Sequence, residues 1–111
     1  MRFRMSLALS ALFLVGLLPV LTTGTADAAS MRAWNRLAHC ESGGRWHIAT
    51  GNGYFGGLQF SASTWRAFGG RKYAALAHRA SRSEQVRIAE RVRRVQGWNA
   101  WPSCSRRVGL A

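Results

Sequence analysis

The sequence has 111 residues, a formal net charge of +12 and a hydrophobic fraction of 48%, with five tryptophans and two cysteines. This length is too short for two ordinary domains or for an enzyme with a large cofactor-binding fold. The tryptophans and aliphatic residues supply a core, which excludes a disordered basic tail.

The first 28 residues have the order of a secretory signal. Two arginines precede an apolar run over residues 7–21, and Ala26-Asp27-Ala28 places small residues at the −3 and −1 positions of a signal-peptidase site. Cleavage after Ala28 would leave residues 29–111, with 14 basic and 3 acidic side chains and a charge of +11. We therefore expect a secreted or wall-associated monomer without stable membrane insertion. An uncleaved anchor is the alternative, although the run is short for a membrane span.

The next segment has helical periodicity. Five residues, Met31, Trp34, Leu37, Ala38 and Glu41, recur at the spacing of one helical face, and a glycine pair follows them. This pattern predicts a helix over about residues 31–41.

Asn52-Gly53 is the strongest hairpin signal of the chain. It lies between residues 47–51 and residues 54–60, and Asn-Gly favours a two-residue turn because both positions tolerate positive φ. We expect a small β-hairpin here.

Two more helices are predicted from their first residues. Ser61 begins a short segment that ends before Gly69-Gly70. Ser81 and Glu84 form a capping box, and Gly97 supplies the stop for the longer helix between them. Its inward stripe is expected to be Val86, Ala89, Val92 and Val95. The secondary structure of residues 71–80 stays open between one helical turn and an apolar loop.

These elements predict an α+β, mainly helical fold in which a few helices surround one hairpin. Cys40 and Cys104 are expected to form a disulfide, because an even pair in an exported protein is normally oxidised. A zinc site that adds His39 and His47 is the alternative, but it lacks the usual ligand spacing.

Glu41 is the candidate catalytic acid among the three acidic residues after the signal. Glu84 serves in the capping box, and Glu90 lies at surface-pairing distance from Arg87 and Arg94. Glu41 follows the apolar stripe, where burial would raise its pKa and keep a proton available for a glycosidic oxygen. A structural role at the helix end is the alternative.

The glycine-rich segment after Glu41 offers groups that suit a sugar chain. Glycines leave the backbone open to a ligand, and neutral donors and flat rings complement hydroxyl groups and sugar faces. The candidate substrate-binding residues are Trp46, Thr50, Asn52, Tyr54 and Gln59.

The sequence lacks the residues that several other classes of enzyme require. There is no G-x-S-x-G motif, no aspartate after the signal to orient a histidine, and no phosphate-binding loop. We therefore expect no cofactor and no metal. The arginines would also suit nucleic acid, but export argues against that partner.

Nearly the whole segment after the signal resembles the resuscitation-promoting factor domain of actinobacteria. The resemblance rests on a long ordered set of residues: Ala38-x-Cys40-Glu41-Ser42-Gly43-Gly44-x-Trp46, Thr50-Gly51-Asn52-Gly53-Tyr54-x-Gly56-Gly57-Leu58-Gln59-Phe60, Ile88-Ala89-Glu90-Arg91-Val92 and Ala100-Trp101-Pro102-x-Cys104. Two departures are Asn35, where relatives commonly have aspartate, and the segment 71–79.

The resemblance implies a small lysozyme-like domain that cleaves the β-1,4 bond between N-acetylmuramic acid and N-acetylglucosamine in peptidoglycan. It assigns the catalytic glutamate to Glu41, the disulfide to Cys40 and Cys104, and cleft positions to Thr50, Asn52, Tyr54 and Gln59. A lytic transglycosylase needs only one acid, so this mechanism is favoured over hydrolysis, and regrowth of dormant cells is the implied role. Another wall hydrolase is a candidate partner. The alternative function is a secreted glycan-binding or signalling module that does not cleave.

Overall fold

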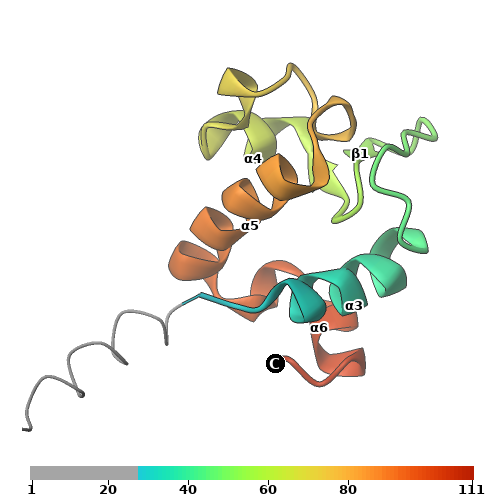
Figure 1. Ribbon diagram of the computed structural model, residues 1–111, viewed down its shortest axis with the longest axis vertical. Helices are drawn as coiled ribbons and strands as arrows, with labels where there is room; N and C mark the ends of the chain where they lie inside the picture. The colour runs from blue at the N-terminus through green and yellow to red at the C-terminus, as the bar shows by residue number, and fades with distance from the viewer. Residues whose placement is uncertain (1–27) are drawn as a thin grey trace, which may run out of the picture.

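The computed structural model describes residues 28–111, so the expected signal sequence lies almost wholly outside the described residues. The elements in chain order are α3 (Met31–Ser42), β1 (Tyr54–Phe55), β2 (Phe60–Ser61), α4 (Ala62–Ala67), η2 (Gly70–Lys72), η3 (Ala77–Arg79), α5 (Arg82–Gln96), η4 (Trp98–Ala100) and α6 (Pro102–Arg107), where η marks a 3₁₀ helix. Figure 1 shows α3 and α6 at one end of the molecule, α4 and the strands at the other, and α5 between them. The α+β, mainly helical fold class is confirmed.

Helix α3 forms where the periodicity predicts it and has a cap at each end. The Ser30 hydroxyl accepts a hydrogen bond from the Ala33 N–H at the start, and Gly43 takes the left-handed conformation (φ 70°) at the end. Trp34 and Leu37 are fully buried, but Met31 is 41% exposed. The expected stripe is therefore wrong at Met31, which lies at the helix start.

The hairpin turns at a different place from the one predicted. β1 pairs antiparallel with β2 through Tyr54 opposite Ser61 and Phe55 opposite Phe60, so the chain reverses over residues 56–59. Gly56 (φ 81°) and Gln59 (φ 56°) supply the left-handed positions of this turn. The loop with Asn52-Gly53 also reverses the chain, but it closes only an isolated bridge between Ala49 and Phe55.

Helix α5 begins with the predicted capping box, in which Ser81 and Glu84 exchange hydrogen bonds, and Gly97 caps its end. Its inner face is made of Gln85, Val86, Ile88, Ala89 and Val92, whereas Val95 is 74% exposed. The expected stripe is wrong at Val95 because each three-residue step falls about 60° short of a full turn. After three such steps from Val86 the side chain faces solvent.

The segments between the longer helices are more regular than the sequence indicated. The ambiguous residues 71–80 hold most of η2 and all of η3, and the buried Trp65 indole of α4 donates to the Ala74 carbonyl at 2.8 Å. The stretch before Cys104, expected to be irregular, contains η4 and the start of α6. Pro102 is at the first position of α6, where its missing N–H is not needed.

The core lies between α3, α5 and the chain that leads into α6. Trp34 packs against Trp98 and Trp101, with ring centroids 4.9 and 5.3 Å apart. The predicted disulfide is present: Cys40 and Cys104 join α3 to α6, with Cα atoms 5.8 Å apart. Within residues 28–111, no helix has the length and apolar character needed to cross a bilayer.

Candidate active site

A groove opens beside the C-terminal end of α3. Its first part has a volume of about 260 Å³ and is lined by Glu41, Tyr54, Gln59, Ala100, Trp101 and Pro102. A second hollow of about 250 Å³ shares Tyr54, Gln59, Ala100 and Trp101 with it and extends to Ser61, Thr64 and Gln96. Because four residues line both hollows, we treat them as one groove, called here the Glu41 groove.

Glu41 is the single acidic residue among those that line the Glu41 groove. The side chain is partly buried, and this burial raises the pKa of the carboxyl above its ordinary value of 4.5. Within the described residues, no hydrogen bond or ion pair holds the carboxylate. Such a group keeps its proton to a higher pH than an exposed glutamate and can pass it to a bound ligand.

Two long-range links fix the walls of the groove. The Cys40–Cys104 disulfide attaches the residue before Glu41 to α6, whose first residue, Pro102, lines the groove. The Trp101 indole donates to the carbonyl of Leu58, which precedes Gln59, at 3.0 Å. The acid, the aromatic wall and the hairpin turn are therefore held in one arrangement.

The polar edge of the groove is a small hydrogen-bond network. The Asn52 amide donates to Gln59 Oε1 at 3.3 Å and accepts from the Tyr54 N–H at 3.0 Å. Gln59 in turn donates from Nε2 to the Gly56 carbonyl at 3.1 Å. Tyr54 is 49% exposed, so its ring and hydroxyl are available to a ligand.

The buried Gln85 side chain holds the hairpin turn at this edge of the groove. The sequence analysis did not predict a role for this residue. Its fully buried side chain accepts from the Gly57 N–H at 3.0 Å and donates to the carbonyls of Trp46 and Ala80 at 2.8 and 3.0 Å. One amide thus ties the hairpin turn to two other segments. Its partners are 5 to 39 residues away, so no local pattern marks it.

Residues 28–104 match the family model described as the transglycosylase-like domain. The chain belongs to this family. The resemblance to resuscitation-promoting factors is confirmed as well, since curated proteins of that name match most of this chain.

The transglycosylase-like chain is 61% identical over 74 residues to resuscitation-promoting factor RpfE of Mycobacterium tuberculosis. These aligned residues make up 67% of this chain and 41% of the relative. It is 58% identical over 86 residues to Rpf1 of Corynebacterium glutamicum, covering 78% of this chain and 45% of the relative. Its identity to Rpf of Micrococcus luteus is 48% over 97 residues, covering 87% and 42%. The chain therefore spans less than half the length of each of these relatives.

The candidate sugar-binding residues of the transglycosylase-like domain are not all in one place. Tyr54 and Gln59 line the Glu41 groove, and Asn52 reaches it through Gln59. Thr50 is exposed and outside the lining residues. Trp46 is also outside the lining; its ring packs so closely on Gly57 that a Cβ there would lie 2.5 Å from the ring.

The other acidic residues of the domain have partners of their own. Glu84 is occupied in the capping box. The expected surface pairing of Glu90 with Arg87 and Arg94 is wrong, because its carboxylate accepts from the Ala29 N–H and the Trp34 indole and pairs with Arg93. The pairing prediction failed because it used sequence neighbours alone, whereas Ala29 lies just before α3 and Trp34 lies in that helix.

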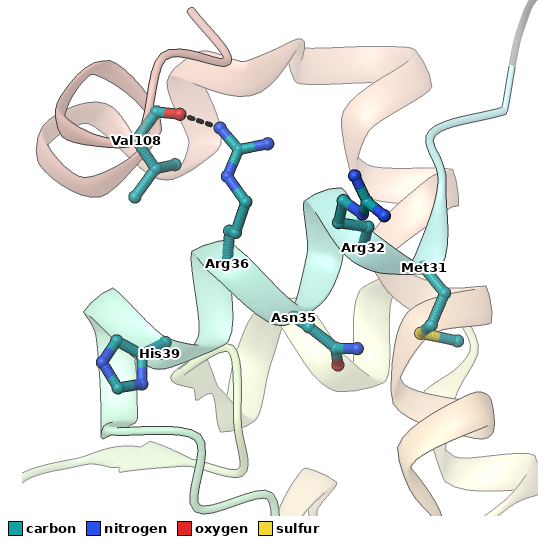
Figure 2. Close-up of a pocket in the computed structure, with 6 residues that line it drawn as sticks. All are labelled: Met31, Arg32, Asn35, Arg36, His39 and Val108. Atoms are coloured by element: carbon teal, nitrogen blue, oxygen red, sulfur yellow. Dashed lines mark hydrogen bonds between the residues drawn. The ribbon is translucent and has the colours of Figure 1, made fainter.

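A separate hollow of about 550 Å³ lies on the outer face of α3 and is lined by Met31, Arg32, Asn35, Arg36, His39 and Val108. Figure 2 shows Arg36 reaching from this face to the carbonyl of Val108, to which it donates a hydrogen bond. None of the six lining residues is acidic, and none of the candidate site residues is among them. This hollow therefore has no carboxyl group that could act as the acid.

The zinc alternative is wrong, because the sulfur atoms of Cys40 and Cys104 are bonded to each other. Among the residues that the structure describes, no three His, Cys, Asp or Glu side chains gather as metal ligands would.

Proposed function

We propose that this domain is a secreted enzyme that cleaves the β-1,4 bond between N-acetylmuramic acid and N-acetylglucosamine in peptidoglycan, and that it acts as a lytic transglycosylase. The observation that carries the proposal is the single carboxyl group of the Glu41 groove, partly buried among neutral polar and aromatic residues. Membership of the transglycosylase-like family supports the substrate class.

In the proposed reaction, the protonated Glu41 donates its proton to the glycosidic oxygen while the bond from that oxygen to the sugar C1 breaks. The resulting carboxylate then removes the proton from the 6-hydroxyl of the same muramic acid residue. The 6-oxygen forms a new bond to C1, which gives a 1,6-anhydro end and returns Glu41 to its protonated form. Because the nucleophile belongs to the substrate, no second protein carboxyl is required, in contrast to a two-carboxylate glycosidase.

Tyr54 and Gln59 are proposed to bind the glycan beside Glu41, with Asn52 holding the Gln59 amide in place. Thr50 and Trp46 have weaker support, since neither lines the groove; Trp46 is better explained as packing beneath the turn. The word resuscitation in the names of the relatives supports a role in the regrowth of dormant cells, and the proposed cleavage of peptidoglycan would remodel the wall.

Product analysis tests the mechanism. The exported protein is incubated with purified peptidoglycan, and the soluble fragments are weighed by mass spectrometry. Anhydro ends, lighter than reducing ends by one water, support the proposal, whereas reducing ends alone indicate hydrolysis. Binding without fragments, over a range of pH and salt, would favour the signalling module.

Glu41→Gln is the decisive variant, because it preserves shape and hydrogen bonding but has no proton to donate. We expect the rate of fragment release to fall by on the order of a hundredfold or more. Glu84→Gln is the matched control, since glutamine also completes a capping box and residue 84 is outside the groove. Full activity of Glu41→Gln would exclude the proposed acid.

A further inference from the structure

Glu90 connects the segment before α3 to α5. Its Oε2 atom accepts one hydrogen bond from the backbone nitrogen of Ala29 and another from the indole of Trp34, both at 2.9 Å. Its Oε1 atom pairs with Arg93 at 3.0 Å, and the Glu90 side chain is only 13% exposed. One carboxylate therefore holds both the chain entering α3 and a core tryptophan of that helix.

The Ala29 nitrogen is also the atom that cleavage after Ala28 would set free. Ala28 is exposed, whereas Ala29 is partly buried. Hydrolysis of the bond between them adds one water, leaving a carboxylate on Ala28 and an α-ammonium on Ala29. The new ammonium would form at the position where the amide N–H already points at Glu90.

We propose that removal of the signal sequence converts this hydrogen bond, which a neutral amide donates, into an ion pair between the Ala29 α-ammonium and Glu90, which locks α3 onto α5. The inference rests on the proposed export, but it concerns the maturation of the fold and is independent of what Glu41 does. It assigns to the processed N-terminus a defined binding site in the folded domain.

The electrostatics at the start of α3 explain why this site needs a carboxylate. The N-terminal end of a helix carries a partial positive charge, which repels a nearby ammonium. The first turn of α3 has no acidic residue of its own and contains Arg32. Glu90 supplies the missing negative charge from α5, and its low exposure limits screening by solvent.

The pair should make stability depend on pH in a defined way. The charged groups that contact the Glu90 carboxylate are Arg93 of α5 and, after cleavage, the Ala29 ammonium; Trp34 is neutral, and Arg93 also lies over the Trp98 ring at 5.2 Å. A carboxylate partner raises the pKa of an α-amine above its usual value of about 7.7–8.0. The stabilisation is therefore complete below that value and is lost as pH rises through the folded-state pKa.

The sequence permits a selective test, because Lys72 is its single lysine. In a chain carrying Lys72→Arg, the α-amine is the only amine left after export, so acetylation neutralises that group alone. The full chain is expressed and exported, and the protein is purified from the medium. Intact mass and N-terminal sequencing should identify Ala29 as the first residue. A different first residue would overturn the proposal.

The thermodynamic cycle compares acetylated with free protein in two backgrounds, Glu90 and Glu90→Gln. Acetylation should lower Tm by several degrees when Glu90 is present. In Glu90→Gln it should leave Tm unchanged or raise it slightly, because glutamine can still accept from the Trp34 indole but offers no charge to offset the repulsion between the ammonium and the N-terminal end of α3. An equal effect in both backgrounds, or none in either, would contradict the ion pair.

A second measurement requires no Glu90 variant. The rate of acetylation as a function of pH gives the pKa of the α-amine in the folded protein and in a peptide of residues 29–34. We expect the higher value in the protein, and an equal or lower value would overturn the pairing. Neither assay uses peptidoglycan, so a failure of the proposed enzymatic function would leave these results unaffected.

Discussion

The Glu41 carboxyl combines two properties that oppose each other at the scale of a single residue. Burial keeps its proton available for the proposed transfer to the glycosidic oxygen, and the same burial makes the ionised form unfavourable in the folded protein. A group of this kind lowers stability at neutral pH. The acid should therefore be functionally useful and structurally costly.

Replacing it should make the protein more stable at neutral pH. Below pH 4.5, the ordinary value for glutamate, the carboxyl is protonated in both the folded and unfolded states, so its burial carries no ionisation cost. Above that pH the cost grows until the raised folded-state pKa is reached, and it then stays constant. We expect Glu41→Gln to have a higher Tm than the wild type at pH 7, with the difference vanishing near pH 4.

Thermal melts of the two proteins across this pH range test the linkage. Glu84→Gln, in the first turn of α5, should show no comparable gain at neutral pH. A Tm advantage of Glu41→Gln that is equally large at pH 4 and pH 7 would mean that ionisation is not its cause.

The fully buried Gln85 side chain should stabilise the fold through its three hydrogen bonds. Gln85→Met preserves the approximate volume but leaves the Gly57 N–H and the carbonyls of Trp46 and Ala80 without this partner. Each unsatisfied buried group costs about 1–3 kcal/mol, so we expect the loss of three partners to lower the free energy of unfolding by at least about 3 kcal/mol.

Chemical denaturation of Gln85→Met measures this loss, and Gln96→Met on the exposed face of the same helix is the control. The control should change the free energy of unfolding by less than about 0.5 kcal/mol. Equal stabilities of the two variants would show that the Gln85 bonds contribute little.

At the scale of the elements, the sequence was informative wherever a signal is local. Ser61 and Ser81 mark helix starts through bonds to residues three positions later, and these helices form as predicted. The Asn-Gly signal was also local, yet strand pairing follows the turn that contains Gly56 and Gln59. A turn propensity gives a place where the chain can reverse, whereas the pairing of strands depends on packing across the core.

The residues of the candidate site also divide into those that a local sequence pattern marks and those that only the fold brings together. Glu41 follows from its helical spacing, and Trp101 has a flat ring that suits a sugar, but Ala100 and Pro102 line the groove with them and carry no chemical signature in the sequence. Glu90 was misassigned because its partners Ala29 and Trp34 are 61 and 56 residues away. Contacts of this range come from the fold as a whole.

The disulfide is the element-level feature with the largest expected effect. Cys40 and Cys104 are separated by 64 residues, and closing such a loop stabilises a chain by on the order of 4 kcal/mol in the chain-entropy model. Cys104→Ser, or reduction, should lower both Tm and the rate of fragment release, because Cys40 adjoins Glu41. Thiol titration of the exported protein should find no free thiol, and two reactive thiols would contradict this account.

At the scale of the whole molecule, the charge of +11 on residues 29–111 should govern association with the cell wall. Peptide stems of peptidoglycan carry carboxylates, and opposite charges attract over a distance set by salt. Raising the ionic strength from about 0.1 M to 1 M shortens that distance from about 10 Å to about 3 Å. We expect binding to stem-bearing peptidoglycan to weaken strongly over this range.

Uncharged oligomers of N-acetylglucosamine provide the control for this prediction, because their contacts in the groove involve neutral groups. Their affinity should change little between the same two salt concentrations. A salt response of equal size for both ligands would assign the effect to the protein instead of to the wall carboxylates.

If the chain is exported as proposed, the link between α3 and α6 also sets an order of events during translocation. A chain that crosses the membrane from its N-terminal end delivers Cys40, together with Glu41, long before Cys104 arrives. Cytosolic thiol pools keep cysteines reduced, so the two sulfur atoms could join only after Cys104, which is 64 positions beyond Cys40, has been translocated. The acid thus reaches the outside before the wall of the groove that faces it is fastened. A partly translocated chain would carry its proton donor without a closed binding surface, and cutting would be delayed until translocation had delivered the second cysteine.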